Sequence, residues 1–349
     1  MKKINLFGLF AEDIAELLAP LELPKYRSKQ VVEWLYQRDA ASFAEMTNLP
    51  VTVRALLEQT FSIHQPVLKA QQNSQDGKTS KYLLEFADGE AVETVLMRQP
   101  YGNSVCVSSQ VGCGMGCVFC ASTLQGVIRN LNAGEMLAQV LYIRKILGFS
   151  HQTVNNIVIM GSGEPLANYD QVLQFIRLCH QEYCLHLSYR SITLSTSGIV
   201  PAMDRLGAEG LPLTLAISLH APEDTLRSKL MPVNQRYSVR EVVAAGDRYA
   251  QNTGRRVTYE YALIDGWNDQ PVQARQLASL LSGRLCNVNL IPVNAVPERG
   301  LARPAPARIE SFARILTDRH IAVTVRREMG ADIQAACGQL RNKAGKTIH

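Results

Sequence analysis

Apolar and polar positions follow two different periods along this chain. Over the first 70 residues the apolar side chains recur at helical spacing, most clearly in residues 11–21 (AEDIAELLAPL) and 27–37 (RSKQVVEWLYQ). This spacing predicts short amphipathic helices, and the prolines between these stretches predict where the helices end. Residues 1–70 are therefore predicted to form a small helical accessory domain.

Apolar and polar side chains alternate in residues 81–97 (KYLLEFADGEAVETVLM), with Asp88 and Gly89 near the centre of the stretch. Alternation on both sides of an Asp-Gly pair is typical of a β-hairpin. We predict that residues 71–98 form a hairpin that connects the helical domain to the main domain.

Beyond this hairpin, short apolar runs alternate with helical stretches. The predicted strands are residues 104–110, 156–162, 191–197, 213–220, 257–264 and 287–294. The predicted helices between them include residues 133–148, 169–183, 239–251 and 271–283. Strand–helix repetition predicts parallel strands joined by crossover connections, and six such units favour a barrel over a flat doubly wound sheet. The predicted fold class is α/β, a partial (β/α)6 TIM-type barrel over residues 99–332, followed by a C-terminal loop and basic tail at 333–349.

Most of the predicted barrel strands end in polar or small residues, in the stretches GSGEP, STSG, SLH and PVN. In (β/α) barrels the active site lies at the carboxyl ends of the strands. These strand ends are therefore the expected source of binding residues.

Composition narrows the class of protein further. With 46% hydrophobic and 19% charged residues, the chain predicts a globular core rather than disorder. Its apolar stretches are too short to span a bilayer, and acidic residues soon follow Met1-Lys2-Lys3 where a signal peptide would have an apolar core. We expect a soluble, cytoplasmic monomer with no membrane partner, in which eight cysteines favour metal binding or catalysis over disulfides.

The net charge of +5 is unevenly distributed. From Arg299 to the end there are ten Lys/Arg against four Asp/Glu, whereas the first 98 residues carry eleven against thirteen. A basic region suits a polyanion such as RNA, but basic surfaces that bind nothing are also common. Basic and aromatic side chains also alternate in residues 25–38, which fits either a helix that grips a nucleic-acid backbone or one with a solvated face.

Three cysteines, Cys113, Cys117 and Cys120, form a C-x3-C-x2-C motif after the first predicted barrel strand. Thiolates are the usual ligands of iron–sulfur clusters, and three of them on a four-iron cluster leave one iron open to a small molecule. A structural zinc site needs a fourth ligand, for which Cys106 is awkwardly placed inside a strand. A cluster is the favoured hypothesis, with zinc and unliganded core thiols as alternatives.

This motif, with Phe119 before its last cysteine, resembles the signature of radical S-adenosylmethionine (SAM) enzymes. Further stretches extend the similarity, in order, from about residue 25 to residue 340, and the whole pattern is similar to the adenosine methyltransferases of the RlmN/Cfr group. The stretches are CVSSQVGC, GSGEPLAN, STSGIVPAM, AISLHAP, NLIPVN and DIQAACGQL. The resemblance implies a 4Fe-4S cluster on Cys113, Cys117 and Cys120, with SAM on the open iron.

The RlmN branch of this group methylates C2 of an adenosine in 23S rRNA, and some members also methylate a tRNA anticodon-loop adenosine. The Cfr branch methylates C8 of the rRNA adenosine and confers antibiotic resistance. Pro165 and the stretch NLIPVN favour the RlmN branch, whereas Ser162 and Ala295 depart from the usual pattern at positions that should affect packing only. Two rivals are another radical SAM enzyme, such as an activase, and a zinc-dependent RNA-binding module.

The resemblance also implies a mechanism. Because C2 of adenine is electron-poor, one SAM would first methylate the sulfur of Cys337, and a second would give a 5′-deoxyadenosyl radical that removes a hydrogen atom from this methyl group. The methylene radical would add to C2, Glu93 would accept the C2 proton, and Cys106 would release the product by forming a disulfide with Cys337. From the residues alone, Cys337 and Cys106 look like ordinary core thiols and Glu93 like a surface strand residue.

The same resemblance assigns SAM contacts at the strand ends. These residues are Gly163, Glu164, Ser195, Ser218, Leu219, His220 and Asn294. Without the family, His220 would be a core histidine, and Gly163 and Glu164 a tight turn. The implied partners are 23S rRNA, tRNA in some members, and an electron donor such as flavodoxin or ferredoxin. Arg326 and Arg327, just before the stretch DIQAACGQL, are candidate phosphate contacts or, equally, solvated charges at a strand end.

Overall fold

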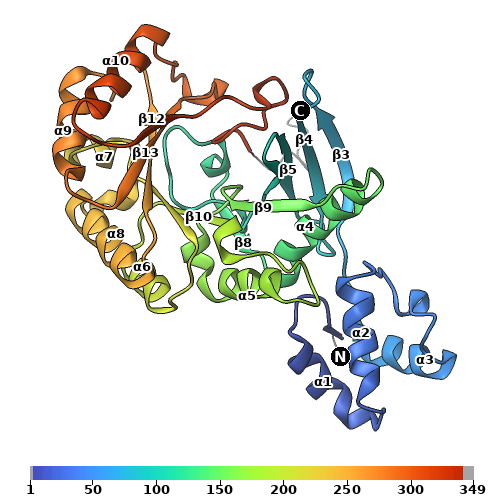
Figure 1. Cartoon of the computed structure of the whole chain (residues 1–349). Helices are drawn as coiled ribbons and strands as arrows, with labels where there is room; N and C mark the ends of the chain where they lie inside the picture. The colour runs from blue at the N-terminus through green and yellow to red at the C-terminus, as the bar shows by residue number, and fades with distance from the viewer. Residues whose placement is uncertain (1–2, 341–349) are drawn as a thin grey trace.

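Ten strands of this chain form one sheet, shown in the computed structural model in Figure 1. The structure describes residues 3–340, so the part of the predicted basic tail at 341–349 lies outside the described residues. The strand order is β14-β13-β12-β11-β10-β9-β6-β5-β4-β3. The sheet therefore runs from the last described strand back to the antiparallel strands that precede the barrel.

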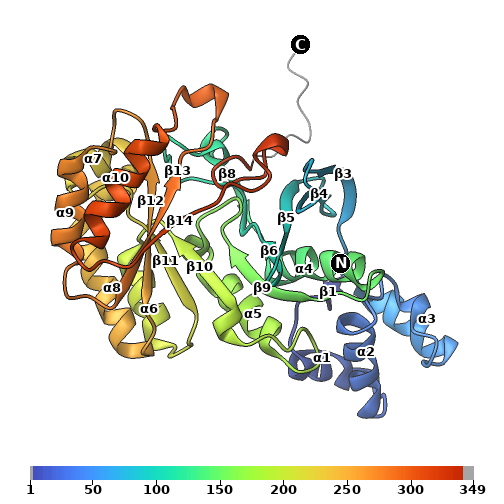
Figure 2. The ribbon, with the colours of Figure 1, turned by 45° about the horizontal axis from the view of Figure 1, so that its top comes forward.

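The parallel part of the sheet is a partial barrel. Its strands are β6 (Gly102–Cys106), β9 (Val154–Ile159), β10 (Ile192–Thr196), β11 (Thr214–Ser218), β12 (Val257–Leu263), β13 (Cys286–Pro292) and β14 (Val323–Val325). The connecting helices are α4 (Ala133–Gly148), α5 (Tyr169–His180), α6 (Val200–Ala208), α7 (Asp224–Leu230), α8 (Val239–Thr253), α9 (Pro271–Leu281) and α10 (Pro306–Thr317). Figure 2 shows helices on the outer side of the curved sheet. The predicted (β/α)6 partial barrel is confirmed.

Local sequence signals explain where several helices begin. The side chain of Asn132 accepts a hydrogen bond from the backbone N–H of Glu135 at 2.9 Å, and Glu135 accepts one from the N–H of Asn132 at 2.9 Å. This reciprocal cap starts α4 at the predicted residue, because it satisfies two N–H groups that the helix itself leaves unpaired. Ser238 and Glu241 cap α8 in the same way, and Gly254 ends it with a φ of 66°.

Three antiparallel strands extend the barrel sheet, and we call them the antiparallel extension: β3 (Val67–Asn73), β4 (Thr79–Glu85) and β5 (Ala91–Gln99). The predicted hairpin around Asp88 and Gly89 is the β4–β5 pair, but it is part of the main sheet rather than a separate connector. All of β3 is exposed, so its sequence has no buried face to give an alternating pattern. The boundary predicted at residue 70 falls inside this strand.

The N-terminal part of the chain is a small helical lobe beside the barrel (Figure 1). Its elements are β1 (Ile4–Asn5), α1 (Ala11–Leu18), α2 (Tyr26–Tyr36), α3 (Val51–Thr60) and β2 (Phe61–Ser62). The buried hydroxyl of Tyr36 accepts from the N–H of Gly8 at 3.0 Å and donates to the carbonyl of Leu9 at 2.6 Å. Arg144 of α4 forms an ion pair with Asp39, which attaches this lobe to the barrel.

Shorter elements complete the chain. One is a hairpin of β7 (Gln110–Gly112) and β8 (Val127–Asn130). The others are single 3₁₀ turns: η1 (Ala19–Leu21), η2 (Phe43–Glu45), η3 (Ala121–Thr123), η4 (Pro165–Asn168), η5 (Tyr189–Ser191), η6 (Pro232–Gln235), η7 (Pro297–Arg299) and η8 (Ala331–Ile333). None of the helices in residues 3–340 is both long and apolar enough to cross a membrane.

After β14 the chain returns across the open side of the barrel as the C-terminal loop, residues 326–340. Near its end the carbonyl of Gly338 accepts from the N–H of Ala121 at 2.7 Å, and the carbonyl of Leu340 accepts from the hydroxyl of Ser122 at 2.7 Å. These bonds join two segments that are more than two hundred residues apart in sequence. They place the C-terminal loop directly beside the cysteine motif.

Candidate active site

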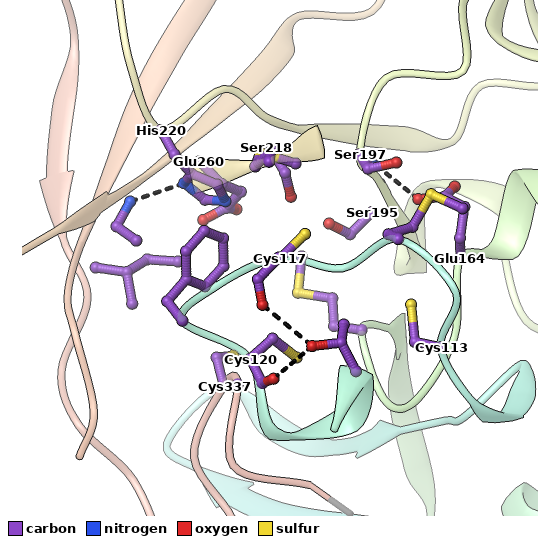
Figure 3. A pocket seen from close by; sticks show the side chains of 18 of the residues that line it. Cys113, Cys117, Cys120, Glu164, Ser195, Ser197, Ser218, His220, Glu260 and Cys337 are labelled. Atoms are coloured by element: carbon purple, nitrogen blue, oxygen red, sulfur yellow. Dashed lines mark hydrogen bonds between the residues drawn. The ribbon is translucent and has the colours of Figure 1, made fainter. Parts of the chain in front are cut away.

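The cysteine loop, residues 113–120, lies between β7 and β8. The two strands approach so closely at Gly112 that a Cβ there would lie 2.0 Å from the carbonyl oxygen of Gly126, so only glycine fits. Cys113 and Cys117 are buried and Cys120 is partly exposed. All three side chains line one cavity of about 160 Å3, which we call the first cavity (Figure 3).

The first cavity lies at the carboxyl ends of β9 to β13, as the barrel prediction requires. Six of the seven predicted SAM contacts line it: Gly163, Glu164, Ser195, Ser218, His220 and Asn294. Cys337 also lines it, although this residue comes from the C-terminal loop. The structure therefore brings together residues that are spread over more than two hundred positions of the sequence.

Glu164 is held by three donors from its own chain. Its carboxylate accepts from Thr196 Oγ1 at 2.7 Å and from the N–H groups of Ser197 at 2.7 Å and Leu166 at 3.0 Å. Burial raises the pKa of this carboxyl group above its usual value, although the three donors act against this shift. Gly163 precedes it with a φ of 110°, and a Cβ there would lie 2.7 Å from the backbone nitrogen of Gln110. The turn after β9 is thus fixed, with the Glu164 carboxylate oriented at the cavity wall.

His220 contributes a neutral imidazole to the first cavity. The N–H of Ala262 donates to its Nδ1 at 2.9 Å, so the ring proton is on Nε2. Burial and the nearby guanidinium of Arg227 lower the pKa of His220 to about 3. The ring of Phe119 meets it edge-on, with centroids 4.7 Å apart, and so links the cysteine loop to β11. His220 can therefore act as a hydrogen-bond donor at neutral pH without carrying a charge.

A second cavity of about 820 Å3 lies between the antiparallel extension, β13, β14 and the C-terminal loop. Several basic side chains line it: Lys78, Arg98, Arg303, Arg326 and Arg327. Cys337 lines this cavity as well as the first, and so do Met160, Ile291, Asn294 and Arg326. The two cavities therefore share a wall that carries a thiol and a guanidinium group.

Cys106 lies on β6 and faces the second cavity together with Cys337. Burial raises the pKa of the Cys106 thiol to about 12, and the neighbouring Cys337 acts in the same direction while Arg326 opposes it. Both cysteines are free thiols in the structure. The carbonyl of Cys337 accepts from Asn294 Nδ2 at 3.0 Å, which fixes the backbone of this residue against β13.

Comparison with known proteins identifies the family. Residues 107–278 match the radical SAM superfamily, and residues 4–63 match the ribosomal RNA large subunit methyltransferase N-terminal domain. A protein from Symbiobacterium thermophilum named probable dual-specificity RNA methyltransferase RlmN is 53% identical, over 97% of this chain and 91% of its own. A relative of the same name from Desulforamulus reducens is 49% identical, over 98% of this chain and 97% of its own.

This chain belongs to the RlmN family of radical SAM RNA methyltransferases. The crystal structure of a radical SAM methyltransferase from Sphaerobacter thermophilus agrees, with a TM-score of 0.94 and 46% identity over 97% of this chain and 99% of that chain. The resemblance inferred from the motifs is confirmed at the level of the family. Membership implies a four-iron cluster and SAM as cofactors.

The residues of the first cavity fit such a cluster. Three thiols of one short loop line the cavity, and Cys337 adds a fourth thiol to its lining. Within residues 3–340, however, no three His, Cys, Asp or Glu side chains stand close enough together to hold a single metal ion. Sulfur donors spread around a cavity suit a group of several atoms better than one zinc ion.

Two predicted site residues of this RlmN family member lie outside both cavity linings. Leu219 is buried, its N–H donates to the carbonyl of Glu260 at 3.0 Å, and its carbonyl accepts from Arg227 Nε at 3.0 Å. Glu93 is also buried, on β5, where its carboxylate lies 3.0 Å from the ammonium of Lys81. The interpretation of Glu93 as a surface residue, which the sequence alone suggested, is therefore wrong.

Arg227 lies beneath the strand ends that form the wall of the first cavity, and it was not predicted as a site residue from the sequence. Its guanidinium is completely buried and donates five hydrogen bonds. The acceptors are the carbonyls of Ser197 (2.7 Å), Ser218 (3.0 Å), Leu219 (3.0 Å) and Tyr237 (3.4 Å), and Asn234 Oδ1 (3.0 Å). Burial lowers the pKa of Arg227 to about 10. The side chain ties together the ends of β10 and β11, from which Ser195 and Ser218 enter the cavity.

Glu260 is a second residue of the first cavity that sequence reasoning missed. It lies buried on β12, and its carboxylate accepts from Asn289 Nδ2 at 2.8 Å. Burial raises the pKa of Glu260 to about 7, although Arg326 and Asn289 lower it. A single carboxylate within the apolar run VTYEYALI was a visible signal. Arg326 lies close to this group and lines both cavities, whereas Arg327 is exposed and lines only the second.

Proposed function

We propose that this enzyme methylates C2 of an adenosine in 23S rRNA, and also of a tRNA anticodon-loop adenosine, through a methyl group carried on Cys337. One observation carries the proposal: Cys337 lines both cavities, and Cys106 lies with it on the second. A thiol in that position can take a methyl group on one side and deliver it on the other. The dual-specificity names of the relatives support the pair of RNA substrates.

The cofactors would bind in the first cavity. Cys113, Cys117 and Cys120 would hold the cluster, and SAM would lie against Gly163, Glu164, Ser195, Ser218, His220 and Asn294. Leu219 would act only by its buried position beneath this wall. When bound, the cluster and SAM supply one-electron chemistry: a carbon-centred radical that removes one hydrogen atom, and an acceptor for one electron later in the cycle.

The thiol of Cys337 carries the carbon. Its sulfur would lose a proton and gain a methyl group from one SAM, which would leave as S-adenosylhomocysteine. Loss of a hydrogen atom from this methyl group to the carbon-centred radical would then leave a methylene radical. The methylene carbon bonds to C2 of the adenine, which covalently joins the enzyme to the RNA. The hydrogen bond from Asn294 to the Cys337 carbonyl holds the backbone at the wall between the cavities during these steps.

The second cavity would hold the adenine and resolve this adduct. Glu93 lies on β5 just outside the lining of this cavity, paired with Lys81, and would accept the proton of C2 as the adduct gives up one electron. The Cys106 thiol would then lose its proton and attack the Cys337 sulfur, which breaks the S–C bond, forms the disulfide and leaves a methylene carbanion that takes up a proton to become the methyl group. An adenine inside folded RNA must leave its stack to reach this site, and the arginines around the cavity would bind the flanking phosphates.

The deciding experiment is mass spectrometry of ribosomal and transfer RNA from cells with and without this gene. Loss of 2-methyladenosine from both RNAs in the deletion strain is the expected result. Loss of 8-methyladenosine instead would assign the enzyme to Cfr-like chemistry, and no change in either base would reject the proposal. The purified enzyme should further require a low-potential reductant such as flavodoxin or ferredoxin and act as a monomer. In the cell we expect it in the cytoplasm.

A further inference from the structure

A buried lysine connects the antiparallel extension to the C-terminal loop. Lys81 lies on β4, and its ammonium is 3.0 Å from Glu93 Oε1 and 3.1 Å from the carbonyl oxygen of Gln334. The side chains of Lys81 and Glu93 are only 9% and 7% exposed. A charge pair so far removed from water requires close geometry to be tolerated, so both partners are held in place.

The strand register shows what this lysine faces. Lys81 pairs with Val95, and Val95 pairs with Cys106, so the three residues form one row across the sheet. Glu93 lies two residues before Val95 and shares its face. Ala335 and Leu340 of the C-terminal loop pack on Val95 and Cys106. The C-terminal loop, which carries Cys337, covers this face of the sheet. The side chain of Lys81 therefore lies on the face that contacts the loop.

Other bonds hold the same loop on both sides. The Asp332 carboxylate accepts from the N–H of Gln75 at 2.9 Å, next to the start of β4. Gly330 turns with a φ of 66°, and a Cβ there would lie 2.6 Å from Thr79 Cγ2. On the barrel side, Asn294 binds the carbonyl of Cys337. Among these anchors, the Lys81 ammonium is the one that also contacts the Glu93 carboxylate.

We propose that Lys81 is a positioning residue that fixes Glu93 and the Cys337 loop relative to each other. The inference rests on the proposed function, because it gives a role to the two groups that this function uses. Glu93 must meet the C2 proton of a base that is attached to Cys337, so the carboxylate and the sulfur need a fixed separation. One ammonium bonded both to the carboxylate and to the loop, three residues before Cys337, sets that separation.

The test measures how fast Cys337 is alkylated by iodoacetamide in the purified full-length protein, followed by peptide mass spectrometry. Lys81→Met removes the bond to Gln334, and Lys81→Met with Glu93→Gln removes it together with the charge of the Glu93 carboxylate. In both variants the Cys337 rate should rise about tenfold, as expected for loss of one charge-assisted hydrogen bond. Lys81→Arg should restore a rate close to that of the unmodified protein.

Two controls separate loop release from general loosening. Lys69→Met breaks a more exposed ion pair on the same extension, with Glu85 at 2.9 Å, and should leave the Cys337 rate unchanged. The alkylation rate of Cys286, which is also partly buried but lines neither cavity, should stay constant in every variant. An equal rise at both cysteines would mean general loosening and would overturn the proposal.

Two further outcomes would also overturn it. One is an unchanged Cys337 rate in a folded Lys81 variant, and the other is failure of both Lys81→Met proteins to fold, because Lys81 would then be a stability residue only. The proposed function is tested separately by RNA methylation with the unmodified enzyme. If this enzyme failed to methylate RNA but showed the expected alkylation rates, the proposed function would be rejected. The positioning role of Lys81 at the C-terminal loop would still be supported.

Discussion

The first cavity holds about 160 Å3 and the second about 820 Å3, and they differ in how their polar groups are bound. In the first, Glu164 and His220 receive hydrogen bonds from the surrounding chain, and Arg227 lies wholly buried behind them. In the second, several arginines and a lysine line the wall, and Arg327 is exposed to solvent. A fixed small site suits a cofactor that is always the same, whereas a wide basic site suits a large polyanion.

The two cavities meet at Cys337, so its loss should give the largest effect. Cys337→Ala should abolish RNA methylation because no sulfur remains to carry the carbon, while SAM binding in the first cavity persists. Methylation assays with purified RNA and equilibrium dialysis of labelled SAM measure the two properties. Cys286→Ala, at a cysteine that lines neither cavity, is the matched control and should keep full activity. Substantial RNA methylation by Cys337→Ala would remove the thiol from the reaction.

Arg227→Met tests the rigidity of the first cavity. The change removes five buried hydrogen bonds, among them those to the carbonyls of Ser197 and Ser218, so the free energy of unfolding should fall by about 3–5 kcal/mol. Urea unfolding measures this loss, and SAM affinity should fall more than RNA affinity. Arg248→Met, which breaks an exposed pair with Asp204, should cost less than about 1 kcal/mol. Equal losses in the two variants would show that the buried network is unimportant.

His220 predicts a pH effect that comes from the first cavity. Its pKa is about 3 in the folded protein against 6.5 for a free imidazole, so the unfolded chain binds the proton first and stability falls as pH decreases below 6.5. Relative to His220→Asn, the unmodified protein should lose roughly 2 kcal/mol of unfolding free energy between pH 7 and pH 5. Urea titrations at each pH measure the difference. His151→Asn, at an exposed position, is the control, and an identical pH profile for all three proteins would contradict the buried, neutral imidazole.

Arg327→Gln should give the smallest effect and act on the second cavity only. Loss of one phosphate contact should weaken RNA binding a few-fold and reduce the slope of log affinity against log salt concentration by about one. Fluorescence binding titrations at several salt concentrations measure this slope, and SAM affinity should not change. Arg319→Gln, at an exposed arginine that lines neither cavity, should leave the slope unchanged. Equal slopes for the two variants would argue against RNA binding at this wall.

The barrel was predictable because its strands are short apolar runs and its helices carry local start signals such as Asn132 and Ser238. β3 was not, since all its residues are exposed and its pairing with β4 comes from backbone groups that any sequence has. The sequence alone therefore did not reveal that the antiparallel extension belongs to the main sheet.

The residues of the candidate site also fall into two groups, those that the sequence predicted and those that it did not. Residues in motifs at strand ends, such as Ser195 and His220, reached the predicted cavity because strand ends of a barrel converge. Arg227 was missed because four of its five acceptors are backbone carbonyls, which leave no trace in the sequence. The burial of Glu93 depends on Lys81 of the neighbouring strand, and such a pair is recognised only when the register is known.

The hydrogen bonds from Ala121 to Gly338 and from Ser122 to Leu340 follow directly on Cys120 at one end and on Cys337 at the other. Whatever displaces one of these two segments must pull on the other. Oxidation of the three cysteines proposed to hold the cluster would thus also displace Cys337, the thiol proposed to carry the methyl group. An oxidised molecule would then lose cofactor binding and methyl transfer together, before the proposed covalent adduct with RNA could form.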